Sequence, residues 1–370
     1  MIGSTLFYAQ RLSAVFLLGY TVWLSSFFLF NQPLEFDAWS VFTDQIIFLI
    51  ITSLVSLIIV IHSFIGGGQC QTILGSYGTV AGGFCNRTSC AHSSILGGTG
   101  NNAFGAGSTI VGGATNQTDS SQELSFIGGG QDNCIDGKGW NFIGGGLDNY
   151  AKGYISTIGG GNCNTIEGDT STIGGGQCNY AGGNVASTLG GFQNCSFGDF
   201  DVIVGGCGHW SKGGSYQFIG GGLLNCIEPE GNCQFNAILS GCTNLIAGPS
   251  IASSIAAGVN NCIFEPLSFI GGGKSNLAKG SELNSVVGGF SNSILGTCAN
   301  IIGGGRDNCI DGNGNNSYNS ILGGYCNWIT CNAACSTIVG GSCNTTLTDH
   351  AVLGGCFNLA LGPGDTIFGF

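Results

Sequence analysis

The residues of this chain that could bind a ligand or take part in catalysis are its cysteines, its histidines, a few aspartates and its glycine runs. The 370-residue sequence contains 19 cysteines and four histidines. Zinc sites need cysteine or histidine ligands at short, fixed spacings. Cys326, Cys331 and Cys335 come nearest to such a group, but no histidine lies at metal-ligand spacing from them. The sequence therefore predicts no metal site.

Glycine runs and aspartates could instead bind phosphate or calcium. Gly273-Lys274-Ser275 matches the end of a phosphate-binding loop, but Ser268 stands where that motif requires its first glycine. Asp132, Asp148 and Asp307 follow glycine runs, yet the Gly-Gly-x-Gly-x-Asp pattern of calcium-binding rolls is absent. The carboxylates also do not recur in a way that builds a catalytic cleft. We therefore expect neither an enzyme nor a cofactor.

The elements that must position these residues follow from a short repeat. Ile-Gly-Gly-Gly, or a close variant, returns from Ile65 to the end of the chain. Numbering each rung by the second residue of its terminal Gly-Gly pair gives 20 rungs, with spacings of 14 to 19 residues. Self-similarity at a short, nearly fixed period is typical of a solenoid built from stacked units.

Two further positions of the rung have a constant character. Ile or Val stands three residues before the second glycine in 19 of the 20 rungs. Asn stands three residues after it in 17 of the 19 rungs that extend so far, and Gln71 and His209 replace it. Stacked β-branched residues would form a dry stripe, and stacked asparagines would pass amide hydrogen bonds between rungs. The predicted ladder residues include Ile127, Ile143, Ile158 and Ile173, and Asn133, Asn149, Asn164 and Asn179.

The repeat therefore predicts the fold of residues 64–370. Fifteen or so residues hold two short strands and two turns, with glycine pairs at the corners. We expect an all-β solenoid, a parallel β-roll or β-helix of about 20 short rungs of about 15–16 residues each.

Many cysteines are neighbours of the ladder asparagine. They are Cys85, Cys163, Cys178, Cys326 and Cys343 before it, and Cys134, Cys195, Cys226, Cys262 and Cys309 after it. We interpret them as small apolar fillers at a turn, because free cysteine is commonly buried. A disulfide framework is the alternative, although the odd count and the scattered positions differ from those of a compact secreted scaffold.

The Ser-x-Ile-Gly-Gly-Gly-x-x-Asn blocks, for example Ser156 to Asn164 and Ser171 to Asn179, resemble known repeats. They are similar to those in the heads of bacterial trimeric autotransporter adhesins, and the resemblance covers residues 65–370. It implies a left-handed parallel β-roll in which three chains share a core, and hence a homotrimer. The chain departs from that family in showing no convincing cleavable signal, no heptad stalk and no C-terminal barrel anchor.

Two apolar runs, about 12–30 and 45–61, precede the repeats. Each has about the 17–25 residues that a helix needs to span a bilayer. A signal peptide is the alternative for the first run, which is longer than usual and lacks a small-x-small cleavage site. We therefore expect residues 1–63 to form a membrane anchor, a hairpin of two transmembrane α-helices.

The charges flanking these runs predict the topology. Arg11 is the only basic residue before the first run, and the connector from Asn31 to Asp44 contains no Lys or Arg. The positive-inside rule places the N-terminus in the cytoplasm. Two spans return the chain there, so we expect a multi-pass membrane protein with its rod on the cytoplasmic side.

The composition narrows the choice of partners. Only 8% of residues are charged, and the formal net charge is −12. Phosphate binding needs a basic stripe, so nucleic acid is not an expected partner. Stacked like charges repel, and the low charge therefore follows from the repeat itself.

The longest rungs contain the expected points of contact. Insertions in a solenoid become loops on one face, commonly the contact face. The candidate contact residues are Glu228, Glu230, Asp311, Asn313 and Asn315.

These features together predict a non-enzymatic structural protein. We expect a membrane-anchored rod that links a bilayer to shell or capsid proteins, such as a minor capsid protein at the inner membrane of a large DNA virus. The alternative is a surface-exposed fibre or adhesin, which the side of the membrane that carries the rod would distinguish.

Overall fold

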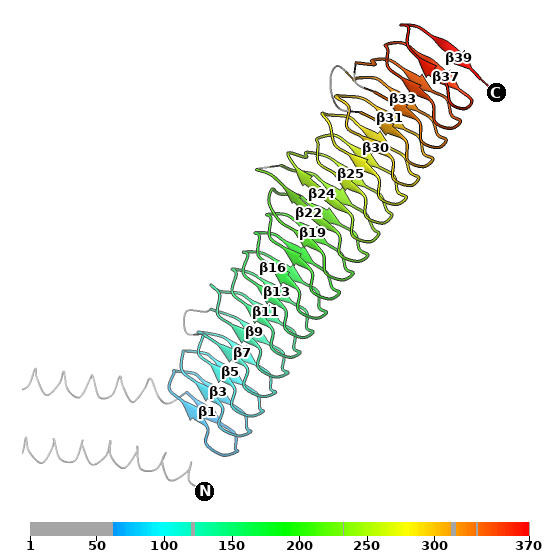
Figure 1. The fold of residues 1–370 in the computed structure, drawn as a ribbon. Coiled ribbons are helices and arrows are strands. Elements are labelled where there is room, and N and C mark those ends of the chain that lie inside the picture. Colours follow the sequence, from blue (N-terminus) through cyan, green and yellow to red (C-terminus); the bar gives the residue numbers. More distant parts are fainter. Residues whose placement is uncertain (1–61, 120–122, 232, 312–315, 331, 370) are drawn as a thin grey trace, which may run out of the picture. The chain divides into compact units, whose positions relative to one another are not determined.

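The computed structural model describes residues 62–119, 123–231, 233–311, 316–330 and 332–369, which belong to two compact units that divide after Leu147. Each unit is a parallel β-solenoid (Figure 1). The predicted spans, 12–30 and 45–61, lie outside the described residues. Within the part of the chain that is described, no helix is long and apolar enough to cross a membrane.

The first unit contains two parallel sheets, which we call odd and even after the numbers of their strands. The odd sheet comprises β1 (Phe64–Ile65), β3 (Thr79–Val80), β5 (Ser94–Ile95), β7 (Thr109–Ile110), β9 (Phe126–Ile127) and β11 (Phe142–Ile143). The even sheet comprises β2 (Thr72–Ile73), β4 (Arg87–Thr88), β6 (Asn102–Ala103), β8 (Gln117–Thr118) and β10 (Cys134–Ile135).

The second unit repeats this plan. Its odd sheet comprises β13 (Thr157–Ile158), β15 (Thr172–Ile173), β17 (Ser187–Thr188), β19 (Val202–Ile203), β21 (Phe218–Ile219), β23 (Ala237–Ile238), β25 (Ser254–Ile255), β27 (Phe269–Ile270), β29 (Ser285–Val286), β31 (Ile301–Ile302), β33 (Ser320–Ile321), β35 (Thr337–Ile338), β37 (Val352–Gly354) and β39 (Thr366–Phe368). Its even sheet comprises β12 (Tyr150–Ala151), β14 (Thr165–Ile166), β16 (Tyr180–Ala181), β18 (Cys195–Ser196), β20 (Trp210–Ser211), β22 (Cys226–Pro229), β24 (Leu245–Gly248), β26 (Cys262–Ile263), β28 (Leu277–Ala278), β30 (Ser293–Ile294), β32 (Cys309–Ile310), β34 (Trp328–Ile329), β36 (Thr345–Thr346) and β38 (Leu359–Ala360).

Each rung consists of one odd and one even strand, and equivalent residues of successive rungs pair in register. Ile158 pairs with Ile173 in the odd sheet, and Ile166 pairs with Ala181 in the even sheet. The strand pairings within the two units are parallel, so the predicted all-β parallel solenoid is confirmed for the described residues.

The core of the solenoid is a thin layer between the two sheets. Successive strand residues point to opposite faces, so a two-residue strand contributes one inward side chain. Ile158 on β13 and Ile166 on β14 are both fully buried. The inward residue of the even strands, two positions after the ladder asparagine, was not predicted, because it alternates among Ile, Ala, Ser and Thr.

Besides its glycine corner, each rung has two corners at which a residue takes a left-handed conformation. Cys163 has φ 56° and Thr170 has φ 57°, and each directly precedes an inward-facing residue, Asn164 or Ser171. Left-handed backbone is unfavourable for residues with a side chain. Hydrogen bonds between rungs offset this cost, as when the Cys178 amide donates to the Asn162 carbonyl at 2.9 Å.

Candidate functional site

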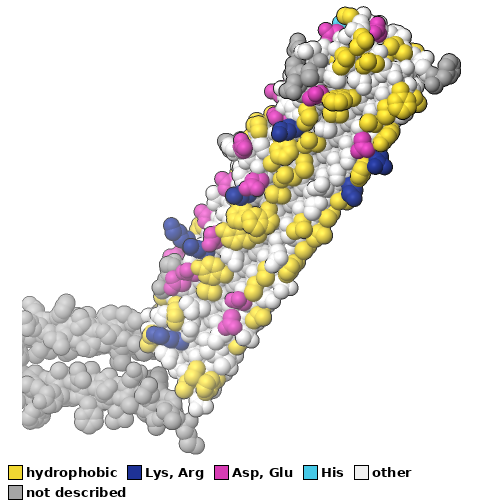
Figure 2. All heavy atoms as spheres, viewed as in Figure 1, with side chains coloured by type: hydrophobic (Ala, Val, Ile, Leu, Met, Phe, Trp, Pro, Cys, Tyr) yellow, Lys and Arg dark blue, Asp and Glu magenta, His cyan; other side chains and the backbone are white. Residues whose placement is uncertain are grey.

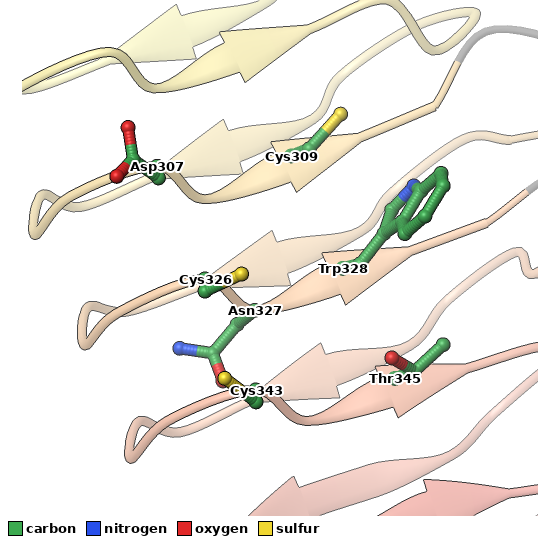
Figure 3. Close-up of a pocket in the computed structure, with 7 residues that line it drawn as sticks. All are labelled: Asp307, Cys309, Cys326, Asn327, Trp328, Cys343 and Thr345. Carbon is green, nitrogen blue, oxygen red and sulfur yellow. The ribbon is translucent and has the colours of Figure 1, made fainter. Parts of the chain in front are cut away.

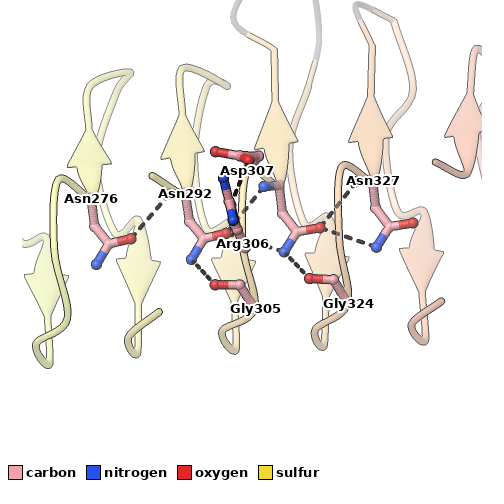
Figure 4. Close-up of polar contacts among 8 residues, drawn as sticks. Asn276, Asn292, Gly305, Arg306, Asp307, Gly324 and Asn327 are labelled. Atoms are coloured by element: carbon pink, nitrogen blue, oxygen red, sulfur yellow. Dashed lines mark hydrogen bonds and ion pairs between the residues drawn. The ribbon is translucent and has the colours of Figure 1, made fainter. Parts of the chain in front are cut away.

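The inward asparagines form a continuous hydrogen-bonded ladder in each unit. The backbone amide of Asn308 donates to Oδ1 of Asn292 at 3.1 Å, and the Asn292 amide donates to Oδ1 of Asn276 at 3.0 Å (Figure 4). The Asn308 side-chain amide donates to the carbonyls of Gly304 at 2.9 Å and Gly324 at 3.1 Å. One asparagine therefore holds its own corner together and joins it to the rungs on both sides.

The isoleucines and asparagines named for the ladder are buried in the structure. The fully buried isoleucines are Ile127 and Ile143 in the first unit, and Ile158 and Ile173 in the second. The asparagines are Asn133 in the first unit, and Asn149, Asn164 and Asn179 in the second; all four are buried. Their role is structural, since their side-chain amides bond to glycine carbonyls and not toward solvent.

Asn260 and Asn261 give a matched test of the ladder. Asn261 is buried and makes four hydrogen bonds through its backbone amide and its side chain, whereas Asn260 is exposed at the left-handed corner. Asn261→Leu would leave buried backbone groups unpaired, so we expect it to lower the free energy of unfolding by about 1–3 kcal/mol. Asn260→Leu should have little effect, because Leu224 takes the same conformation at the equivalent corner. Urea unfolding followed by circular dichroism would compare them, and equal losses would contradict a specific role for the ladder.

The structure corrects the prediction of a loop that begins at Glu228. Glu228 belongs to β22, whose four residues pair with the four of β24. Two consecutive long rungs lie side by side here, so their extra residues prolong the ladder instead of leaving it. Glu228 is exposed and pairs with Lys212 at 3.1 Å.

The other candidate contact residues are only partly described. Glu230 is exposed just after β22, and its amide donates to the Gly248 carbonyl at 2.7 Å. Asp311 follows β32 and donates its amide to the Ile329 carbonyl at 2.8 Å. Asn313 and Asn315 lie outside the described residues. Glu228 on β22 and Asp311 after β32 are separated by β24, β26, β28 and β30, so the structure does not assemble these residues into one site.

The outward face of the odd sheet in the second unit is free of charge. Among its described residues, no side chain that points outward from an odd strand, and none directly after the inward residue, is charged. Most rungs place one large apolar side chain on this face, and Leu239 and Val287 are more than half exposed, at 53% and 55%. Figure 2 shows hydrophobic side chains gathered in bands that run from rung to rung across the described strands. Bands of this kind commonly mark surfaces that contact other molecules.

This uncharged face has a regular internal structure. In two rungs the outward strand residue is a phenylalanine and the residue after the inward isoleucine is a glycine. These pairs are Phe218 with Gly220 and Phe269 with Gly271. A Cβ on either glycine would lie 3.3 Å from the ring of that phenylalanine, so the ring lies over the glycine. Where the outward residue is small, as at Ala237, a leucine or valine often follows instead. This alternation was not predicted, although the Phe-Ile-Gly and Ser-Ile-Leu triplets of the sequence contain it.

The left-handed corners before the odd strands carry a second apolar column. Phe200, Tyr216 and Phe235 stack on successive rungs with ring centroids 4.7 and 5.2 Å apart. All three are exposed. Stacked aromatic rings are rigid and amphipathic, and such residues are enriched where proteins bind one another.

A shallow hollow of about 190 Å³ lies on the even sheet of the second unit (Figure 3). Its lining residues are Asp307, Cys309, Cys326, Asn327, Trp328, Cys343 and Thr345. Among the described residues, no group of three or more His, Cys, Asp or Glu side chains is placed to hold a metal ion.

The exposure of the cysteines in this hollow contradicts an interpretation made from the sequence. We expected the cysteines beside the ladder asparagine to be buried fillers. Cys326 is exposed and Cys343 is half-buried, and among the described cysteines only Cys233 is buried. The reason is geometric: the residues on either side of the inward asparagine point away from the core.

A carboxyl group, Asp201, and an imidazole, His209, are buried within the second unit. Burial raises the pKa of Asp201 to about 6, although the Ser211 hydroxyl donates to its Oδ2 at 2.6 Å. Burial lowers the pKa of His209, whose Nδ1 accepts a hydrogen bond from the Asn225 amide at 3.1 Å. A neutral imidazole thus takes the place of an asparagine in the ladder. Both groups are used for packing between rungs, not for a solvent-accessible reaction.

Comparison with known proteins does not identify a family for this chain. The chain matches no protein-family model and no curated protein.

Proposed function

We propose that this protein is a non-enzymatic, membrane-anchored rod that links a bilayer to a protein shell, in the manner of a viral minor capsid or membrane-anchor protein. The observation that carries the proposal is the uncharged apolar face of the odd sheet, which repeats from rung to rung. A face of this kind suits an extended contact with other proteins better than it suits a small ligand.

The position of the solenoid along the chain adds to this argument. β1 begins at Phe64, three residues after the second predicted span ends at Ile61. So short a connection would hold the first rungs at the membrane surface. Within the first unit, contacts made by later rungs would then occur at increasing distances from the bilayer, which is the arrangement that a spacer needs.

Self-association is part of the same proposal. A second copy offers an uncharged face with the same spacing between rungs, so exposed side chains could interdigitate without burying an unpaired charge. We favour a homotrimer, in line with the resemblance of the repeats to trimeric adhesin heads.

Membrane topology tests the proposal. With an epitope tag after Phe370, the protein should stay in membranes after alkaline carbonate washing. We expect the tag to be digested by protease added to cytoplasm-side-out vesicles, and to be protected in intact cells. A variant that lacks residues 1–61 serves as the control and should appear in the soluble fraction.

The partner can be sought with a photo-crosslinking residue at Leu322, on the odd face, and with a control at Trp328, on the even face. Adducts with shell proteins should form mainly from position 322.

A tag that protease removes from intact cells would reject the internal link and favour the surface fibre. Extraction by carbonate would reject the anchor.

A further inference from the structure

The corner position just before the ladder asparagine has an unusual distribution of cysteines. Each rung has one such corner, and six of them carry cysteine. All six fall on neighbouring rungs two by two: Cys70 with Cys85, Cys163 with Cys178, and Cys326 with Cys343.

The cysteines on the outer face of the even strands provide a contrast. Cys195, Cys226, Cys262 and Cys309 are separated from one another by rungs that carry Trp210, Leu245 or another residue at that position. Pairing is thus a property of the corner and not of the abundance of cysteine.

The corner brings the two members of each pair close together. Cys326 and Cys343 have φ 55° and 54°, so they repeat the same conformation. The rungs are in register on both sides of them, where Tyr325 pairs with Ser342 and Trp328 pairs with Thr345. Equivalent Cα atoms of neighbouring parallel strands lie about 4.8 Å apart, which is within the range that a disulfide spans.

The side chains also meet. The neighbouring Cys70 thiol contributes, after desolvation, to a raised pKa of Cys85, and Cys326 does the same for Cys343. All four of these cysteines are free thiols in this structure.

We propose that these three corner pairs are sites of reversible disulfide formation between rungs. The inference is independent of the proposed function. One corner thiolate attacks a small oxidised disulfide, such as oxidised glutathione, and forms a mixed disulfide with release of one glutathione thiol. The neighbouring thiolate attacks the protein sulfur of that mixed disulfide and releases the second glutathione. The protein loses two electrons and two protons, and both end on the two glutathione thiols.

The positions of the pairs indicate what the bonds would do. Cys70 and Cys85 join the first two rungs, and Cys326 and Cys343 join two rungs near the other end of the chain. A solenoid opens most easily at terminal rungs, which have fewer neighbours. Each bond would close a loop of a single rung and prevent that rung from separating from the next.

The test uses the full-length protein in mild detergent, which is incubated with oxidised glutathione at mildly alkaline pH. Acid then stops the thiol exchange, and the remaining free thiols are alkylated in denaturant. Chymotrypsin cleaves after Trp328 and so separates Cys326 from Cys343. We expect a linked peptide pair that contains both cysteines, and its loss after reduction. Cys343→Ser should replace the link by one glutathione on Cys326, and serine is tolerated there because Ser275 and Ser291 occupy equivalent corners. Cys309→Ser is the matched control and should leave the link intact.

The result that would overturn the proposal is equally specific. If the unsubstituted protein carries stable glutathione on both Cys326 and Cys343, the corner does not favour their pairing. Links formed as often between Cys309 and Cys326 as between Cys326 and Cys343 would also overturn it, because they would show unselective oxidation.

Discussion

Ile302→Asp is expected to unfold the solenoid around β31, whereas Ile301→Asp, one residue earlier in the same strand, should be tolerated. Ile302 is fully buried between the sheets, and Ile301 is 44% exposed on the outer face. The first substitution removes a buried side chain and puts a carboxyl group in the thin core, where nothing can hydrate it. We expect a loss on the order of 5 kcal/mol. The second should change the free energy of unfolding by less than about 1 kcal/mol.

Urea unfolding by circular dichroism, with hydrogen exchange to locate the change, would measure this difference. In a solenoid each rung depends on its neighbours, so faster exchange should be centred on β29, β31 and β33. Equal effects of the two substitutions would show that the inward and outward positions of the strand have been exchanged.

Gly305→Ala is expected to cost about 3 kcal/mol, because it combines an unfavourable backbone conformation with overpacking. Gly305 has φ +88°, and a Cβ there would overlap the carbonyl oxygen of Gly324 and the side-chain amide of Asn308. The same atoms hold the ladder between these rungs (Figure 4). The substitution should therefore weaken both the corner and the asparagine.

Gly304→Ala is the matched control for that substitution. A Cβ on Gly304 would meet no atom within 4 Å. The two variants differ by one position in a run of identical residues, so composition cannot explain a difference between their unfolding midpoints. If Gly304→Ala proved the more damaging, the second glycine would not be the residue that forms the corner.

The repeat predicted the odd strand, the ladder asparagine and the glycine corner, because each position accepts almost a single residue type. Ile158 must fill the core, Asn164 must bridge three rungs, and Gly161 faces the next rung too closely for a side chain. The inward even-strand position was not predicted. Ile166, Ala181 and Ser196 are all fully buried there, so this position accepts side chains of different volumes.

Two surface features also escaped prediction from the sequence, for different reasons. The corner residues with positive φ include Ile155 and Val185, for which such a conformation is unusual, and only the bonding between rungs accounts for it. Glu228 looked like a loop residue beside proline, but the next rung is long as well and extends the pairing. Each case depends on the neighbouring rung, about which a motif within a single rung contains no information.

The asparagine ladder also gives the stack a direction of growth. The Oδ1 atom of Asn292 accepts from the backbone of Asn308, so each rung offers an acceptor to the rung that follows it in the chain. During synthesis the N-terminal rungs leave the ribosome first. A completed rung can then act as a template for the next, and the solenoid can zip up in the order of translation without waiting for its C-terminal end.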